Sequence, residues 1–149
     1  MYVQQDKIVI TVKDLRHLSV LVVDDNQHML ALMRGILSAL GIKNVRTVRD
    51  GVLAFEELRV FAADLVICDY HMEPLDGIDF VLLIRTASDS PNKTVPIMMM
   101  TGHSDRATVL ASREAGVTEF LAKPISVKAL AERILRVIQR QRQEDATKP

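Results

Sequence analysis

The chain has 149 residues, 48% of them hydrophobic, which is enough for one domain around a single core. Lysine plus arginine equals aspartate plus glutamate at 19 each, so no overall charge attracts the chain to nucleic acid or to an anionic membrane. Its single cysteine excludes an intrachain disulfide, and no apolar run is long enough to span a bilayer. Composition therefore predicts a cytoplasmic protein with neither nucleic acid nor a membrane as its partner.

Short apolar runs alternate with longer amphipathic stretches along the chain. The first run covers residues 18–23 and precedes a helical pattern at 29–40, which Gly41 ends. A second strand is predicted at residues 45–48, and Asp50 can cap the helix that follows it. Further strands are predicted at residues 65–68, 95–100 and 120–121, and further helices at 78–87, about 105–115 and after a cap at Ser126.

This order is strand followed by helix, five times over. Runs that are apolar on both faces and separated by helices favour a parallel sheet covered on both sides. With right-handed crossovers, the predicted fold is a doubly wound α/β sandwich of five strands and five helices. We expect residues 1–17 to be an N-terminal extension, 18–142 the domain and 143–149 a flexible polar tail. Alternation at residues 8–13 makes a short extra strand possible in the extension.

Polar side chains follow four of the five apolar runs. The first run is followed by Asp24 and Asp25, the third by Asp69, the fourth by Thr101 and the fifth by Lys123. Ligands of an open parallel sheet bind beyond the carboxyl ends of its strands, so we expect these five side chains to converge at one edge.

The converging residue types favour a metal-assisted reaction at phosphorus. Three clustered carboxylates repel one another unless positive charge lies among them. Oxygen ligands suit Mg²⁺, which binds one or two carboxylates and keeps several waters. A carboxylate beside Mg²⁺ and a lysine can attack phosphorus and form an aspartyl phosphate, while both cations neutralise the phosphoryl oxygens.

With these residues in place, the chain resembles the response-regulator receiver (CheY-like) family over residues 18–139. The resemblance rests on residues 21–26, which read Leu-Val-Val-Asp-Asp-Asn, and on Asp69 with Met72, Asp76 and Gly77 after it. The Thr101-Gly102 pair and residues 120–124, which read Phe-Leu-Ala-Lys-Pro, complete it. The resemblance implies a flavodoxin-like fold with strand order 2-1-3-4-5 and suggests a single-domain response regulator.

The resemblance also implies a role for each matching residue. Asp69 would be the phosphoacceptor, and Lys123 would contact the phosphoryl group. Mg²⁺ would be bound by the side chains of Asp25 and Asp69 and the backbone carbonyl of His71, with Asp24 acting largely through a metal-bound water. The switch pair would be Thr101 and Phe120, and the bond from Lys123 to Pro124 would be cis.

By this resemblance the protein is a signalling switch of a two-component system. It would take a phosphoryl group from a histidine kinase or a histidine phosphotransfer protein, and catalyse only its own phosphorylation and dephosphorylation. The face of the fourth helix, fifth strand and fifth helix would change for a downstream protein. Because 149 residues leave no room for an attached output domain, output is expected through protein contact or a phosphorelay.

The sequence departs from the family pattern around Asp69. Glu73 stands where the family usually has proline, and Pro74 comes one residue later, which adds a negative charge near the site. Two histidines flank the site, His71 after Asp69 and His103 after Thr101. Because these positions influence phosphoryl lifetime in the family, we expect both histidines to affect attack by water.

Two other functions use the same kinds of residue. A haloacid-dehalogenase-like phosphohydrolase would carry Asp-x-Asp after the first strand, but Asp24 and Asp25 are adjacent and no Asp-x-Asp occurs. A non-phosphorylated binding module on the same fold would lack the acceptor or the lysine, and both are present. The basic last helix is explained either by its dipole and solvation or by docking of an acidic partner; its arginines include Arg133, Arg136, Arg140 and Arg142.

Overall fold

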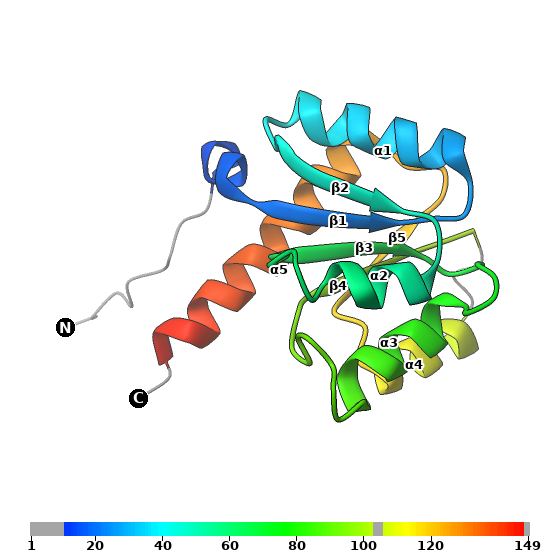
Figure 1. Cartoon of the computed structure of the whole chain (residues 1–149). Coiled ribbons are helices and arrows are strands. Elements are labelled where there is room, and N and C mark those ends of the chain that lie inside the picture. Colours follow the sequence, from blue (N-terminus) through cyan, green and yellow to red (C-terminus); the bar gives the residue numbers. More distant parts are fainter. Residues whose placement is uncertain (1–10, 103–105, 148–149) are drawn as a thin grey trace.

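A computed structural model describes residues 11–102 and 106–147 (Figure 1). The strands are β1 (Ser19–Val23), β2 (Asn44–Val48), β3 (Leu65–Asp69), β4 (Ile97–Thr101) and β5 (Glu119–Ala122). The helices are α1 (Gln27–Ala39), α2 (Gly51–Glu57), α3 (Gly77–Thr86), α4 (Arg106–Ala115) and α5 (Val127–Thr147), preceded by a 3-10 helix, η1 (Val12–His17). All neighbouring strands are parallel and their order is β2-β1-β3-β4-β5, so the predicted fold is confirmed.

Two apolar layers hold the sheet between its helices. Successive strand residues point to opposite faces, so Val20 and Val22 pack toward α1 and α5, whereas Leu21 and Val23 pack toward α2 and α3. The same alternation holds in β4, where Met98 faces the first layer. Burial on both faces explains why the strands read as nearly continuous apolar runs.

Side-chain caps define where the helices begin. Asn26 accepts hydrogen bonds from the backbone N–H groups of His28 at 2.9 Å and Met29 at 3.2 Å, so α1 begins two residues before the predicted start. The predicted caps are confirmed: Asp50 accepts from the backbone N–H of Leu53 at 2.7 Å, and the Ser126 hydroxyl accepts from Ala129 at 3.0 Å. Each of these caps lies a few residues after the end of a strand, so the helices begin close to the edge of the sheet.

The end of the predicted extension belongs to the folded domain. Thr11 donates its backbone N–H to the Asp14 carboxylate at 2.7 Å, and this contact opens η1. Leu15 of η1 is fully buried in the layer that contains α1 and α5. The possible strand at residues 8–13 is therefore wrong for Val12 and Lys13, which lie in η1; residues 8–10 lie outside the described chain.

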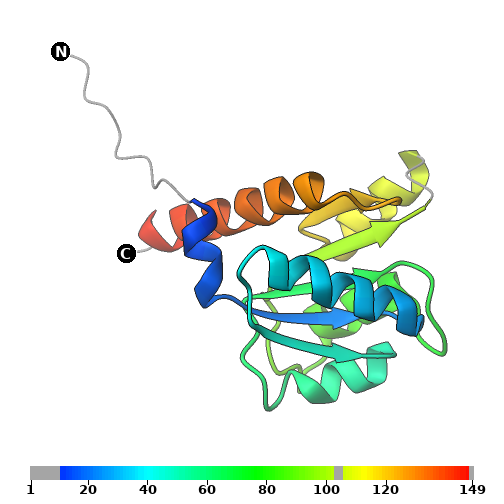
Figure 2. The same cartoon turned by 90° about the horizontal axis from the view of Figure 1, so that it is seen from above.

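Helix α5 is longer than the sequence suggested. It continues through Thr147, so residues 143–147 of the predicted tail are helical. Gln143, Glu144 and Ala146 of this stretch have high helix propensity. The helix projects past the strands toward η1 (Figure 2). Nη1 of Arg142 lies 3.9 Å from Oδ1 of Asp14 in η1. In the part of the chain that the structure describes, no helix is both long and apolar enough to cross a membrane.

Arg85 connects α3 to the end of α4. Its Nε and Nη2 donate to the carbonyl of Gly116 at 3.1 and 2.9 Å, and its Nη1 donates to the carbonyl of Lys93 at 2.9 Å. Burial lowers the pKa of Arg85 below its usual value. Gly116 ends α4 with a φ of 108°, which favours glycine, so the arginine stacks against a turn that has no side chain.

We expect Arg85→Met to destabilise the protein by about 1–2 kcal/mol, because a similar stem remains but three carbonyl hydrogen bonds are lost. The free energy of unfolding in urea, followed by circular dichroism, measures this. Arg49→Met, at an exposed arginine, is the matched control and should lie within about 0.5 kcal/mol of the wild type. Equal stability of the two variants would show that Arg85 does not stabilise the α3 to α4 contact.

Candidate functional site

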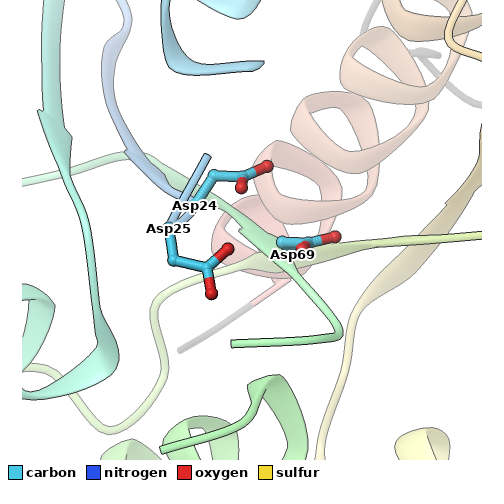
Figure 3. A group of neighbouring side chains, drawn as sticks. All are labelled: Asp24, Asp25 and Asp69. Atoms are coloured by element: carbon cyan, nitrogen blue, oxygen red, sulfur yellow. The ribbon is translucent and has the colours of Figure 1, made fainter. Parts of the chain in front are cut away.

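The structure brings together the residues that follow the strands. Asp24 and Asp25 leave the end of β1, and Asp69 ends the neighbouring strand β3 (Figure 3). Carboxylate oxygens of all three residues lie within 4.8 Å of one another. Asp24 and Asp69 are buried, whereas Asp25 is exposed to solvent. The predicted acidic cluster is therefore present, with two of its members held by the protein interior.

Asp24 is the carboxylate of the site whose charged form burial disfavours. Its Oδ1 accepts a hydrogen bond from the backbone N–H of Asn26 at 2.9 Å, but its buried Oδ2 has no hydrogen-bond partner among the described residues. Burial raises the pKa of Asp24 from 3.8 to about 6, and the charge of Asp69 adds to the rise. The Asn26 hydrogen bond and Lys123 oppose it. A buried carboxylate with an unpartnered oxygen is suited to a cation or its bound water.

Lys123 forms the one ion pair of the site among the described residues. Its Nζ lies 2.7 Å from Oδ1 of Asp69, the last residue of β3. The lysine is positioned by β5, and its backbone N–H donates to the carbonyl of Thr101 at 2.9 Å. The bond from Lys123 to Pro124 is cis, as predicted. One ammonium among three carboxylates leaves an excess of two negative charges if all are ionised.

The donor set of the site fits Mg²⁺. All three candidate ligands are carboxylates, which suit a hard cation, and the excess of negative charge favours a divalent one. The unpartnered oxygen of Asp24 points to the same requirement. Asp24, Asp25 and Asp69 are therefore the residues that could hold the ion. No cysteine or histidine belongs to the cluster among the described residues.

The predicted switch residues lie on neighbouring strands. Thr101 is buried at the end of β4, opposite Ala122 of β5. Phe120 pairs with Met99 and is half-buried against the apolar layer that contains α2 and α3. The side chain of Phe120 therefore contacts both the apolar layer and solvent.

The loop after Asp69 forms a cleft beside the acidic cluster. A cavity of about 240 Å³ is lined by Asp25, His71, Met72, Glu73 and Asp76. Glu73 thus lines the cleft, as its place in the sequence suggested, and the bond from Glu73 to Pro74 is cis. The ring of His71 packs edge-on against Tyr70 with centroids 4.8 Å apart. His103, the other predicted rate-modulating histidine, lies outside the described residues.

Gly77 is a site residue whose role the sequence motif did not explain. A Cβ at this position would lie 2.6 Å from the backbone oxygen of Asp69 and 2.7 Å from Sδ of Met99. Its N–H also donates to the carbonyl of Tyr70 at 2.9 Å. The start of α3 therefore packs directly on the backbone of Asp69, a contact that only a residue without a side chain allows.

Comparison with known proteins agrees with this geometry. The family model described as the response regulator receiver domain matches residues 20–135. The chemotaxis protein CheY1 of Helicobacter pylori is 35% identical over 118 residues, covering 78% of this chain and 94% of the relative. The chemotaxis protein CheY-3 of Vibrio cholerae is 29% identical over 125 residues, covering 84% and 95%.

Solved structures of receiver proteins have a similar fold to this chain. The chemotaxis protein CheY4 of Vibrio cholerae superposes with a TM-score of 0.74 at 28% identity, covering 80% of this chain and 98% of that one. The receiver domain of a sensor histidine kinase from Pseudomonas aeruginosa, solved with a magnesium ion in its active-site cleft, gives a TM-score of 0.69 at 28% identity and covers 80% and 94%. The family match spans more than half of the chain, so the chain belongs to the response regulator receiver domain family.

Proposed function

We propose that the protein is a phosphoacceptor switch of a two-component system, which receives a phosphoryl group on Asp69 in the presence of Mg²⁺. The observation that carries this proposal is the 2.7 Å ion pair from Lys123 to Asp69 beside the carboxylates of Asp24 and Asp25. A nucleophilic carboxylate, a fixed cation and an oxygen-only metal site are then within reach of one phosphoryl group. The signalling histidine kinases of such systems are its expected donors, directly or through a histidine phosphotransfer protein, in the cytoplasm.

The side chains of the site have separate roles in the proposed transfer. An oxygen of Asp69 forms the bond to phosphorus while the bond from phosphorus to the donor nitrogen breaks, and its electron pair leaves with the donor imidazole. Lys123 turns from the carboxylate to a phosphoryl oxygen and balances its charge. Asp24, Asp25 and Asp69, with the backbone carbonyl of His71, would hold Mg²⁺. When bound, this ion neutralises charge on the transferring group.

In the proposed switch, phosphorylation of Asp69 changes the positions of two side chains, one on β4 and one on β5. The hydroxyl of Thr101 would move to a phosphoryl oxygen, and Phe120 would turn inward behind it. This biases an existing equilibrium between two conformations of the α4, β5 and α5 face, which contacts a downstream protein. His71 lines the cleft, so we also propose that it affects attack by water on the phosphorylated carboxylate.

Mass spectrometry after incubation with acetyl phosphate and Mg²⁺ tests the proposal. The wild type should gain one phosphoryl group, which hydrolyses on standing and does not form in EDTA. Asp69→Asn should gain none, because an amide does not attack phosphorus. Asp50→Asn is the matched control: it also follows a strand, and asparagine keeps its capping role, so it should still be phosphorylated.

The competing functions predict other results in the same assay. No adduct and no Mg²⁺ binding would support a binding module that is not phosphorylated. Multiple turnovers on unrelated phosphate esters would instead support a phosphohydrolase. Either result would overturn the proposed switch.

A further inference from the structure

A cluster of arginines surrounds one carboxylate on the face of β5 and α5. Glu119 of β5 has a side chain that is only 10% exposed, and its two oxygens meet three guanidinium groups. The distances are 3.0 Å from Arg133, 3.6 Å from Arg136 and 3.1 Å from Arg140. These arginines lie three and four residues apart, so they share one side of α5, which runs alongside β5 (Figure 1).

The cluster holds more positive charge than Glu119 neutralises. Three arginines and one glutamate leave an excess of two positive charges. A carboxylate has about four lone-pair sites, whereas each guanidinium has five N–H donors, so most donors of Arg136 and Arg140 remain available to another acceptor. Both of these side chains are about half exposed, at 55% and 49%. Solvation and the helix dipole alone do not explain arginines that converge on a strand residue.

The arginines line a cavity that reaches α4. Its volume is about 450 Å³, and Arg113 of α4 lines it together with Arg136 and Arg140 of α5. Arg113 has no ion-pair partner among the residues that the structure describes. The other lining residues come from the segment that leads into β5: Val117, Thr118, Glu119 and Phe120. We call this cavity the arginine pocket.

We infer that the arginine pocket binds an acidic segment of a partner protein. The basic walls favour an occupant with negative charge. A peptide carboxylate fits better than a nucleic acid, because the basic residues form one pocket rather than a stripe, and the chain has no net charge.

This inference deepens the proposed function, on which it rests for its link to Asp69. Phe120 belongs both to the arginine pocket and to the apolar layer that contains α3. An inward turn of this ring would enlarge the pocket and change its affinity for the segment. The charge of the pocket itself does not depend on phosphorylation, so its preference for acidic peptides can be measured separately.

An array of short random-sequence peptides tests the inference, with the full chain labelled by a fluorophore. Acidic peptides should be enriched among the binders of the wild type. Arg136→Gln/Arg140→Gln should weaken the best of them on the order of tenfold, since two guanidinium partners are lost. Arg133 is kept so that Glu119 retains an ion pair, and thermal melting checks that this variant is folded.

The matched control is Lys43→Gln/Arg49→Gln, which removes the same charge from exposed positions at the β2 edge of the sheet. It should change peptide binding less than twofold. Absence of the acidic preference, or its equal loss in both double variants, would overturn the inference. Tighter binding of a single-stranded oligonucleotide, lost in the pocket variant, would overturn it in favour of nucleic acid.

The array is run on untreated protein and on protein treated with acetyl phosphate and Mg²⁺. If Asp69 gains no phosphoryl group, the proposed function fails, while the untreated arm still reads the pocket. If Asp69 is phosphorylated and the acidic preference is absent in both arms, the arginine pocket fails alone. Enrichment of acidic peptides that depends on Arg136 and Arg140 supports the inference in either case.

Discussion

Replacing Gly77 with alanine is expected to destabilise the protein by about 2–3 kcal/mol and to reduce phosphorylation of Asp69. The added methyl group would lie 2.6 Å from the backbone oxygen of Asp69. Sδ of Met99, at 2.7 Å, can move because it ends a flexible side chain, but the oxygen cannot move without shifting the end of β3. The free energy of unfolding in urea measures the first effect, and the yield of the acetyl phosphate reaction measures the second.

Gly35→Ala is the matched control and is expected to have the opposite sign. Gly35 lies in the interior of α1 on its exposed side, and a Cβ there would meet nothing within 4 Å. Alanine should therefore stabilise the protein by about 0.5–1 kcal/mol through its higher helix propensity, with phosphorylation unchanged. Equal stability of Gly77→Ala and the wild type would show that the packing of α3 on Asp69 has room for a methyl group.

The second prediction concerns Asp24→Asn in metal-free protein. Burial raises the pKa of Asp24 to about 6, so between about pH 4 and 6 the folded state holds a proton that the unfolded chain has lost. Stability from this group is therefore highest below the unfolded pKa of 3.8 and falls as the pH rises through about 6. Since one pKa unit corresponds to about 1.4 kcal/mol, the ionised side chain lowers stability at neutral pH by on the order of 3 kcal/mol.

An amide in place of the Asp24 carboxylate removes this charge and keeps an acceptor for the Asn26 N–H, so Asp24→Asn should be more stable than the wild type at pH 7 in EDTA by about 1–3 kcal/mol. The difference should vanish near pH 4. Saturating Mg²⁺ should stabilise the wild type more than the variant. Asp50→Asn, which keeps its helix cap, is the control for replacing an aspartate by asparagine outside the site. A constant difference from pH 4 to pH 7 would contradict the prediction.

The positions of the site residues could be predicted from local sequence. Asp24, Asp69, Thr101 and Lys123 each follow or end an apolar run, and parallel strands bring their carboxyl ends to one edge. The caps at Asp50 and Ser126 were equally predictable, because each cap acts on the backbone three residues away. Strand ends and helix caps depend only on residues a few positions apart, so a single sequence is enough to predict them.

Contacts between distant segments were not predictable in this way. Leu15 stands in a polar stretch that reads as an extension, and only its insertion beside α5 makes it a core residue. Arg85 bonds to Gly116, which is 31 residues away. Glu119 meets arginines 14 and 21 residues later, and in the sequence those arginines fit a solvated helix equally well.

The sequence by itself determined the fold class, the order of its elements and the set of acidic, hydroxyl and basic side chains at the sheet edge. Tertiary structure decided which carboxylate of that set is buried with an unpartnered oxygen, and that Gly77 packs on the backbone of Asp69. It also decided that the arginines of α5 form a pocket with Arg113 of α4. The reason is that periodicity and caps act within a few residues, whereas burial, pKa and cavity shape depend on how whole helices pack against the sheet.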